Sequence, residues 1–256
     1  MVTIQETELR REIMAAIVRA KELSQSVLVS EVQKIERIDP FIFFAAGRER
    51  FAGDRFFWSN PNGTDFLVGL GVATQLHSEH AEGRFRDIAT NWKSLLETAV
   101  FIGKQGIAGT GAAMFGGFSF DPQKEQTALW SKFSHALFHI PSYMLTVHDS
   151  EVYLTTNIVC TQYDDAALFE KVIGERRAVL EASGTEGRQS MPHLKKLTEI
   201  APEEWKQTVS DVVGQLKGSD LKKVVLAREV RLAFTNDIPV EPVLKHLIAE
   251  QKESFI

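Results

Sequence analysis

Basic side chains interrupt an apolar stretch near the end of the sequence. The run LKKVVLAREVRLAF, residues 221–234, carries Lys222, Lys223, Arg228 and Arg231 among valines, leucines and alanines. Its composition predicts a strand, in which Lys222 and Lys223 would point to opposite faces. A lysine in a cavity can hold an anion or act as a general base, and the second role requires burial or nearby positive charge. The competing interpretation is an edge strand whose lysines discourage aggregation.

A glycine-rich stretch, GIAGTGAAMFGGF at residues 106–118, invites comparison with phosphate-binding loops. It lacks the Gly-Lys-Ser/Thr ending of a P-loop, and Met114 replaces the third glycine of a dinucleotide-binding fingerprint. Glycines within strands usually permit a bulge or the close approach of another backbone. We therefore interpret this stretch as structural.

The histidines form two pairs in the sequence, His77 with His80 and His135 with His139. The second pair has the i, i+4 spacing that could ligate zinc on a helix. No HExxH glutamate lies between its members, however, and no third ligand is evident. The single cysteine, Cys160, lies in an apolar strand and is expected to behave as a small hydrophobic residue. We assign no metal ligand in this chain.

Hydrophobic periodicity indicates which elements must position these residues. Apolar residues at helical spacing predict a helix over residues 5–22, whose buried face would be Leu9, Ile13, Ala16, Ile17 and Ala20. Short apolar segments separated by turn residues predict strands at 25–35, 41–46, 55–59, 65–76 and 112–120, and a strand pair within 142–160. Further helices are predicted at 83–101, 164–182, 202–217 and 241–252.

Strands in meanders, interrupted by single long helices, favour an α/β fold of the α+β type. We expect antiparallel β-sheets in a sandwich with helices packed outside. The stretch 182–201 is polar and rich in Gly, Ser and Pro, which is typical of a linker. It would separate residues 1–181, the N-terminal part of the sandwich, from residues 202–256. The final residues, Ser254 to Ile256, read as a strand that is only beginning.

Composition limits the classes of protein to which the chain could belong. The 256 residues carry a formal net charge of -5, so the clustered basic surface of a nucleic-acid-binding protein is not expected. A single cysteine allows no internal disulfide and fits a reducing, cytoplasmic setting. The N-terminus lacks the apolar core of a signal peptide, and no window approaches a membrane span, so no membrane partner is expected.

The run GSDLKKVVLAREV resembles the lysine-bearing strand of isochorismate synthases, which belong to the chorismate-utilising enzymes. The stretches RFFWSNPNGTDFLVGLGVA, FGGFSFDP and IPSYMLT resemble the N-terminal portion of the same enzymes, so the resemblance covers most of the chain. It implies that Lys223 is the general base that activates water for attack on C2 of chorismate. The implied product is isochorismate for menaquinone biosynthesis, and the implied cofactor is Mg2+.

The resemblance also bounds these implications. The resemblance implies that anthranilate synthases carry glutamine at the position of Lys223, which suits ammonia as the nucleophile. Lysine at this position therefore favours water as the nucleophile. The family's general acid and its magnesium-binding glutamates lie in a C-terminal half that would follow Ile256, so this chain is expected to be a truncated copy. A salicylate synthase, or a non-catalytic or regulatory N-terminal module, are the alternative interpretations.

Overall fold

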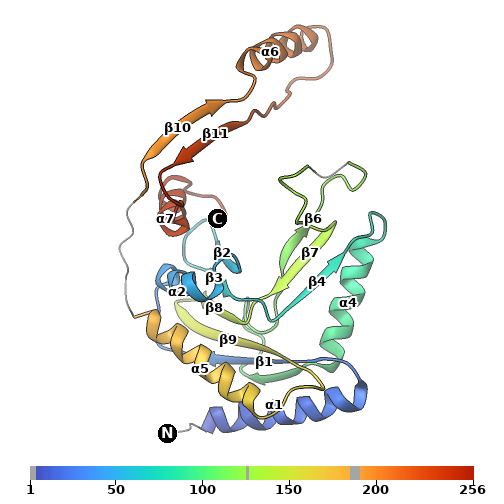
Figure 1. Cartoon of the computed structure of the whole chain (residues 1–256), viewed down its shortest axis with the longest axis vertical. Helices are drawn as coiled ribbons and strands as arrows, with labels where there is room; N and C mark the ends of the chain where they lie inside the picture. The colour runs from blue at the N-terminus through green and yellow to red at the C-terminus, as the bar shows by residue number, and fades with distance from the viewer. Residues whose placement is uncertain (1–3, 125–126, 185–190) are drawn as a thin grey trace. The chain divides into compact units, whose positions relative to one another are not determined.

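The structure, a computed structural model, describes residues 4–124, 127–184 and 191–256 (Figure 1). The chain divides into two compact units, one made of Met1–Gly187 with Lys245–Ile256 and the other of Arg188–Leu244. Part of the expected linker, at residues 182–201, forms strand β10 (Leu194–Glu199). The functional division into 1–181 and 202–256 stays a prediction.

A six-stranded sheet forms the centre of the first unit. Its strands lie in the order β2-β3-β8-β9-β1-β5, and every neighbouring pair is antiparallel except β1 and β5, which are parallel. The predicted strand pair within 142–160 is confirmed as the hairpin of β8 and β9. The strands are β1 (Val27–Lys34), β2 (Arg55–Ser59), β3 (Phe66–Leu70), β5 (Val100–Gly103), β8 (Tyr143–His148) and β9 (Glu151–Cys160).

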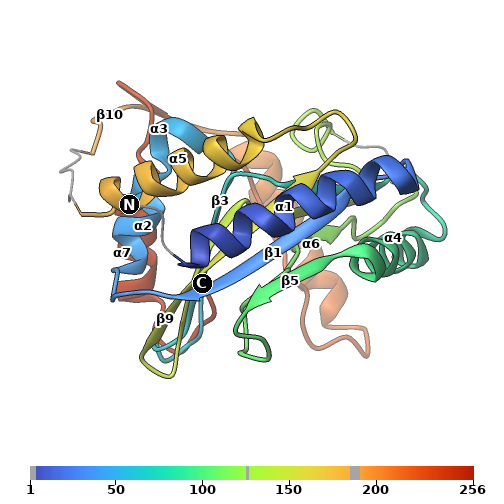
Figure 2. The ribbon, with the colours of Figure 1, turned by 90° about the horizontal axis from the view of Figure 1, so that it is seen from below.

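Helices α1 (Ile4–Leu23) and α5 (Ala167–Ala182) lie side by side across one face of this sheet (Figure 2). The hydrophobic core lies between these helices and strands β1, β5 and β9. The buried face predicted for the first helix is confirmed, and its residues are at most 2% exposed: Leu9, Ile13, Ala16, Ile17 and Ala20.

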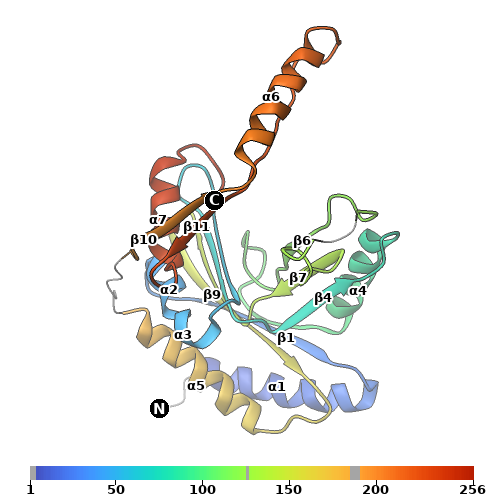
Figure 3. The same cartoon turned by 45° about the horizontal axis from the view of Figure 1, so that its top comes forward.

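A second, three-stranded sheet has the order β4-β7-β6 and is antiparallel throughout. Its strands are β4 (Thr74–Ser78), β6 (Phe115–Phe118) and β7 (Ala136–Ile140), and helix α4 (Arg84–Thr98) packs against β4 (Figure 3). The single strand predicted at 65–76 is therefore wrong, because β3 and β4 belong to different sheets. The chain changes direction at Gly71, whose φ of +69° is in the region that favours glycine.

The strand predicted at 41–46 is also wrong, because these residues form helix α2 (Pro40–Ala46), followed by the short helix α3 (Arg48–Phe51). The side chain of Asp39 accepts hydrogen bonds from the backbone N–H groups of Phe41 and Ile42, at 2.8 and 3.2 Å. Pro40 stands at the first helical position, where its missing N–H costs nothing. These N-terminal signals outweigh the strand preference of FIFFAA.

The second unit contains β10, helix α6 (Pro202–Leu216) and β11 (Val230–Phe234), with β10 and β11 paired antiparallel. Helix α7 (Val240–Glu250) follows. The buried hydrophobic side chains of the described residues all lie between Leu9 and Val179, so none comes from this unit. The seven helices and the antiparallel sheets in the described residues confirm the predicted fold class. No described helix combines the length and hydropathy of a membrane span.

Candidate functional site

The residue predicted to act as a base, Lys223, lies in an exposed segment of the second unit. Residues 221–229 form neither helix nor strand and connect α6 to β11. The side chains of Lys222 and Lys223 are both exposed. Within the described residues, Lys223 makes no hydrogen bond and no ion pair. The structure therefore does not distinguish the two lysines by burial or by contacts.

The strand predicted over 221–234 is confirmed only for its last five residues, Val230–Phe234. These residues pair with β10, from Leu194 opposite Phe234 to Glu199 opposite Val230. Strand β10 ends at Glu199, and one further backbone bond, from Ile200 N to Glu229 O at 3.3 Å, follows the ladder. Residues 221–228 lie beyond this last bond. A strand must satisfy its backbone groups with a neighbour. Composition alone favours a strand, but no strand in the described residues lies opposite residues 221–228 to pair with them.

Two arginines near Lys223 in the sequence, Arg228 and Arg231, are candidates for supplying positive charge to it, but each is paired with an acid of the same unit. A guanidinium nitrogen of Arg228 lies 3.2 Å from a carboxylate oxygen of Glu199, and Arg231 donates to Glu229. All four side chains are substantially exposed, so these pairs contribute little to stability.

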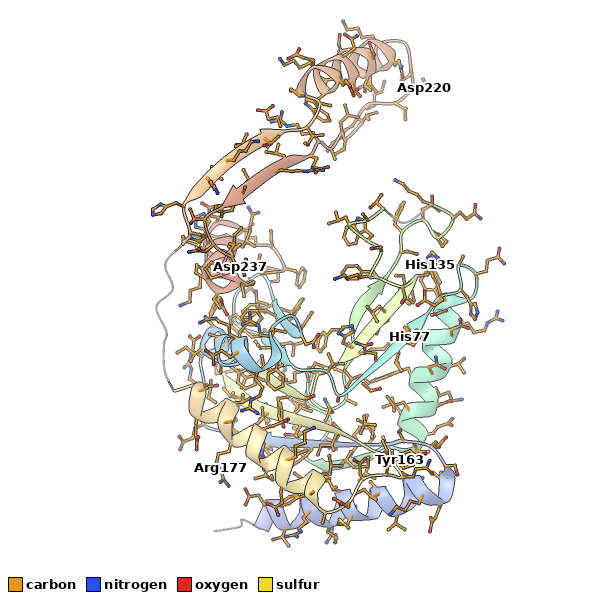
Figure 4. The ribbon with its side chains drawn as sticks, in the orientation of Figure 1. His77, His135, Tyr163, Arg177, Asp220 and Asp237 are labelled. Carbon is orange, nitrogen blue, oxygen red and sulfur yellow. The ribbon has the colours of Figure 1, made fainter. Side chains whose placement is uncertain are left out.

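The histidine pairs do not form a metal centre. His135 and His139 were considered as ligands on a helix, but His139 lies in β7 and His135 immediately precedes it. Figure 4 shows His77 on the three-stranded sheet and His135 at its end. In the parts of the chain that the structure describes, no three His, Cys, Asp or Glu side chains are grouped to hold a metal ion.

One serine–histidine contact, between Ser119 and His135, requires comment because such pairs can form nucleophiles. Ser119 Oγ lies 3.1 Å from His135 Nδ1, and the backbone N–H of Ser119 donates to the carbonyl of His135 at 2.9 Å. The two residues thus extend the pairing of β6 with β7. Among the described residues no carboxylate accepts a hydrogen bond from His135, so the contact lacks the third member of a catalytic triad.

The glycine-rich stretch has the structural role that its sequence indicated. A side chain at Gly116 would lie 2.0 Å from the carbonyl oxygen of Leu137, so only glycine lets β6 approach β7 there. Gly109 has a φ of +74°, and its carbonyl accepts a hydrogen bond from Thr146 Oγ1 at 2.6 Å. Cys160 is fully buried, and burial raises the pKa of its thiol to about 12, as expected for a small hydrophobic residue.

Sequence reasoning missed a cavity of about 870 Å³ in the first unit. This volume lies within the usual range of ligand pockets. Its walls come from β2, β6, β7 and residues 119–124 and 127–134, and they meet where the rings of Phe56 and Phe115 lie 3.9 Å apart. The available signal was the aromatic pattern of RFFWS and FGGFSF. Six of the lining residues carry phenyl or indole rings: Phe56, Phe115, Phe118, Phe120, Trp130 and Phe133.

Few charged groups line this cavity. They are Asp54, Arg55, Asp121, Lys124 and His139. The guanidinium of Arg55 donates to the backbone carbonyls of Phe44 and Ala52, at 3.0 and 3.1 Å, so the backbone of its own unit holds it in place. The cavity therefore offers a mainly apolar surface with a few charged or titratable groups.

Comparison with known proteins relates the chain to one family. The family "Chorismate binding enzyme" matches residues 13–256. The chain is 34% identical over 270 residues to isochorismate synthase MenF of Bacillus subtilis, covering 100% of this chain and 55% of that protein. The chain thus spans about half the length of the curated relative that it matches.

A solved structure is also similar. The menaquinone-specific isochorismate synthase MenF of Escherichia coli matches with a TM-score of 0.51 and 17% identity. The match covers 87% of this chain and 46% of the Escherichia coli chain. At this identity the likeness concerns the fold. Because the family match extends over nearly the whole sequence, the chain belongs to the chorismate-binding enzymes.

Proposed function

We propose that the chain is the N-terminal part of an isochorismate synthase that converts chorismate to isochorismate for menaquinone biosynthesis. The observation that carries the proposal is the 34% identity to isochorismate synthase MenF of Bacillus subtilis along the entire chain. The lysine that opens KVVLAR supports water as the nucleophile, since the related ammonia-using enzymes are expected to carry glutamine at the equivalent position. We place the protein in the cytoplasm on the composition arguments alone.

The net result of the proposed reaction is the loss of the hydroxyl group at C4 of chorismate and the gain of a hydroxyl group at C2. A water oxygen forms a bond to C2, the C4–oxygen bond breaks, and the ring double bonds shift between these carbons. Lys223 accepts the proton that the attacking water loses. A general acid beyond Ile256 donates a proton to the departing hydroxyl, so water is consumed and released in equal amounts.

Lys223 needs surroundings that differ from those in this structure. A lysine in water is protonated at neutral pH and cannot accept a proton. Burial or nearby positive charge makes the neutral form accessible. The exposed 221–229 segment does not bury Lys223, and Arg228 and Arg231, the second of which lies in β11, are paired with Glu199 and Glu229. We propose that the remainder of the parent protein covers this segment and completes the site.

The proposed Mg2+ requirement belongs to the parent protein. Bound to the complete enzyme, the cation would orient and neutralise a carboxylate of chorismate. The resemblance assigns its ligands to glutamates beyond Ile256, and the described residues group no comparable set. We therefore derive no step of the reaction in this chain from the metal.

Product analysis of the full-length parent tests the proposal. The enzyme is incubated with chorismate, Mg2+ and ammonium, and the products are separated by chromatography. Isochorismate as the main product is the expected result. Salicylate would favour the salicylate synthase alternative, and anthranilate would show that lysine at position 223 does not select water. No conversion by a folded parent would favour a non-catalytic module.

A further inference from the structure

The outer edge of β2 already carries the beginning of another strand. Ser59 N donates to Ile256 O at 2.9 Å, and Ile256 N donates to Ser59 O at 3.2 Å. Such a reciprocal exchange defines a hydrogen-bonded pair of an antiparallel ladder. The rings of Trp58 and Phe255 are stacked beside it, with centroids 5.8 Å apart. Both partners belong to the first compact unit.

The direction of the β2 backbone groups follows from two further bonds. Asn60 N donates to Asp65 O at 3.1 Å, and Gly71 N donates to Asp54 O at 2.8 Å, so Asn60 and Asp54 face the β3 side. Because backbone groups alternate along a strand, Phe56 and Trp58 also face β3. The N–H and C=O groups of Phe57 therefore point toward the outer edge, as do those of Ser59.

We propose that this edge is the docking surface for the polypeptide that continues from Ile256 in the parent protein. The segment joins β2 as an antiparallel strand in a register that the Ser59–Ile256 pair defines. Position 257 lies opposite Trp58, and position 258 exchanges hydrogen bonds with Phe57. The proposal rests on the longer parent of the proposed function, whose relative is nearly twice as long as this chain, but not on its catalytic activity.

The chemistry of this partner strand follows from the two faces of β2. Position 259 would lie beside Phe56, which lines the cavity and contacts Phe115. On the other face, the ring of Phe57 packs against Phe41, with centroids 5.0 Å apart, and against two further aromatic rings, Phe44 and Phe66. Both faces are apolar, so the partner must be apolar at successive positions, as a buried strand is. Its side chain at position 259 would cover part of the cavity.

A repeated sequence pattern supports the same pairing independently. VLVSEV at residues 27–32 and VLAREV at residues 225–230 share valine, leucine, glutamate and valine at matching places. A proline and a helix follow each copy, Pro40 at the start of α2 and Pro239 immediately before α7. Each stretch is thus followed by a proline and a helix, although residues 27–32 lie in β1 and, of residues 225–230, only Val230 lies in a strand.

The repeat extends to the strands that would pair. The separation between Pro40 and Phe56 equals that between Pro239 and Phe255. Residues from Ser254 onward thus correspond to β2, and two equivalent strands can pair antiparallel about a local twofold axis. In the proposed register, Ser59 pairs with Ile256 just as Phe57 pairs with position 258. This relation places the twofold axis at Trp58.

Amide hydrogen exchange tests the register without any substitution. We compare residues 1–256 with the full-length parent, resolving the exchange of individual amides. The amide of Phe57 should exchange at least about a hundredfold more slowly in the parent, because it gains an acceptor there. The amides of Phe56 and Trp58, which face β3, serve as internal controls and should be protected in both proteins. Equal exchange at Phe57 in the two proteins overturns the proposal.

A crosslink in the parent provides the second measurement. Trp58→Cys combined with a cysteine at position 257 should form a disulfide under mild oxidation, since non-hydrogen-bonded partners bring their Cβ atoms close together. The matched control combines Trp58→Cys with a cysteine at position 258, which points to the opposite face. Equal crosslinking of the two variants overturns the register. Protection of Phe57 that depends on protein concentration would assign the edge to a second copy and also overturn the proposal.

Discussion

Arg176 of α5 donates a hydrogen bond to Glu31 of β1 at 2.6 Å inside the first unit, where the two side chains are 8% and 2% exposed. Gln33 Nε2 also donates to this carboxylate, at 2.9 Å. Burial raises the pKa of Glu31 despite the neighbouring guanidinium. The pair joins helix to sheet, but it also places a carboxylate where water cannot solvate it.

Removal of one member of this pair should cost more than removal of both. Arg176→Met leaves the Glu31 carboxylate buried beside Gln33 only, and we expect it to lower the free energy of unfolding by about 3–5 kcal/mol at pH 7. Arg176→Met combined with Glu31→Met should recover most of that loss, because two apolar side chains need no solvation. Denaturant unfolding of the single and double variants measures both values. Strictly additive losses would contradict this account.

The pH dependence of the Arg176→Met variant has a definite sign. The folded-state pKa of Glu31 is already raised, and loss of the guanidinium removes a cause that lowers it. A carboxyl group with a raised folded-state pKa stabilises the protein more below its unfolded-state pKa, near ~4.3, and less as the pH rises through the folded-state value. The stability deficit of Arg176→Met should therefore be smaller at acidic pH than at neutral pH. A deficit that is constant with pH would assign the loss to packing.

Asp65 joins two turns of the first unit. Its folded-state pKa is lowered, whereas that of Glu31 is raised, so its contribution to stability should depend on pH in the opposite direction. Its carboxylate accepts a hydrogen bond from His148 Nδ1 at 2.6 Å and others from Asn60 and Thr64, and the bond from His148 is the main cause that lowers its pKa. The stabilisation is present above the unfolded-state pKa, near ~3.9, and is lost as the pH falls through the lowered folded-state value.

Asp65→Asn should lower the free energy of unfolding by on the order of 1 kcal/mol at neutral pH, since one amide NH2 must face another donor. The difference from the wild-type protein should begin to shrink below about pH 4, where the unfolded-state carboxyl group becomes protonated, and should vanish as the pH falls through the lowered folded-state pKa. Denaturant unfolding at both pH values measures this change. Asp149→Asn, at a side chain that is 88% exposed, is the control and should have little effect.

Lys223 and Lys222 provide a matched pair for the catalytic proposal, because both are exposed in this structure and neither is part of its core. In the full-length parent, Lys223→Ala should lower kcat for isochorismate formation by about a hundredfold to ten-thousandfold, as loss of a general base commonly does. Lys222→Ala should retain most of the activity. Thermal unfolding of both variants controls for damage to the fold. Equal losses of activity would return the segment to a role in edge protection.

The local sequence pattern predicted the fold best where an element forms its hydrogen bonds and buried face from residues close together in the sequence. The buried face of α1, strand β2 and the β8–β9 hairpin followed from periodicity and turn residues, since their contacts are local or one-sided. The helix at Pro40 carried its signal in Asp39, but the aromatic run that follows favours a strand by composition.

Contacts between distant segments could not be predicted in the same way. The parallel pairing of β1 with β5 joins residues that are separated by about seventy positions, and no local pattern encodes it. The cavity likewise depends on the approach of β6 to β2 through Phe56 and Phe115. For the segment around Lys223, composition indicated a strand although the described residues contain no neighbour for it.

The chain of residues 1–256, expressed alone, should show no Mg2+-dependent conversion of chorismate. Its second unit contributes no buried hydrophobic side chain among the described residues, and Val225 is 80% exposed. Uncovered apolar side chains favour aggregation and the binding of hydrophobic dyes.

Amides of β10 and β11 should exchange faster than those of β9. Val225→Thr should reduce dye binding with little change in Tm, whereas Val29→Thr, at a fully buried position, should lower Tm. Steady isochorismate formation by residues 1–256, with strong amide protection in β10 and β11, would show that the active site is complete within them.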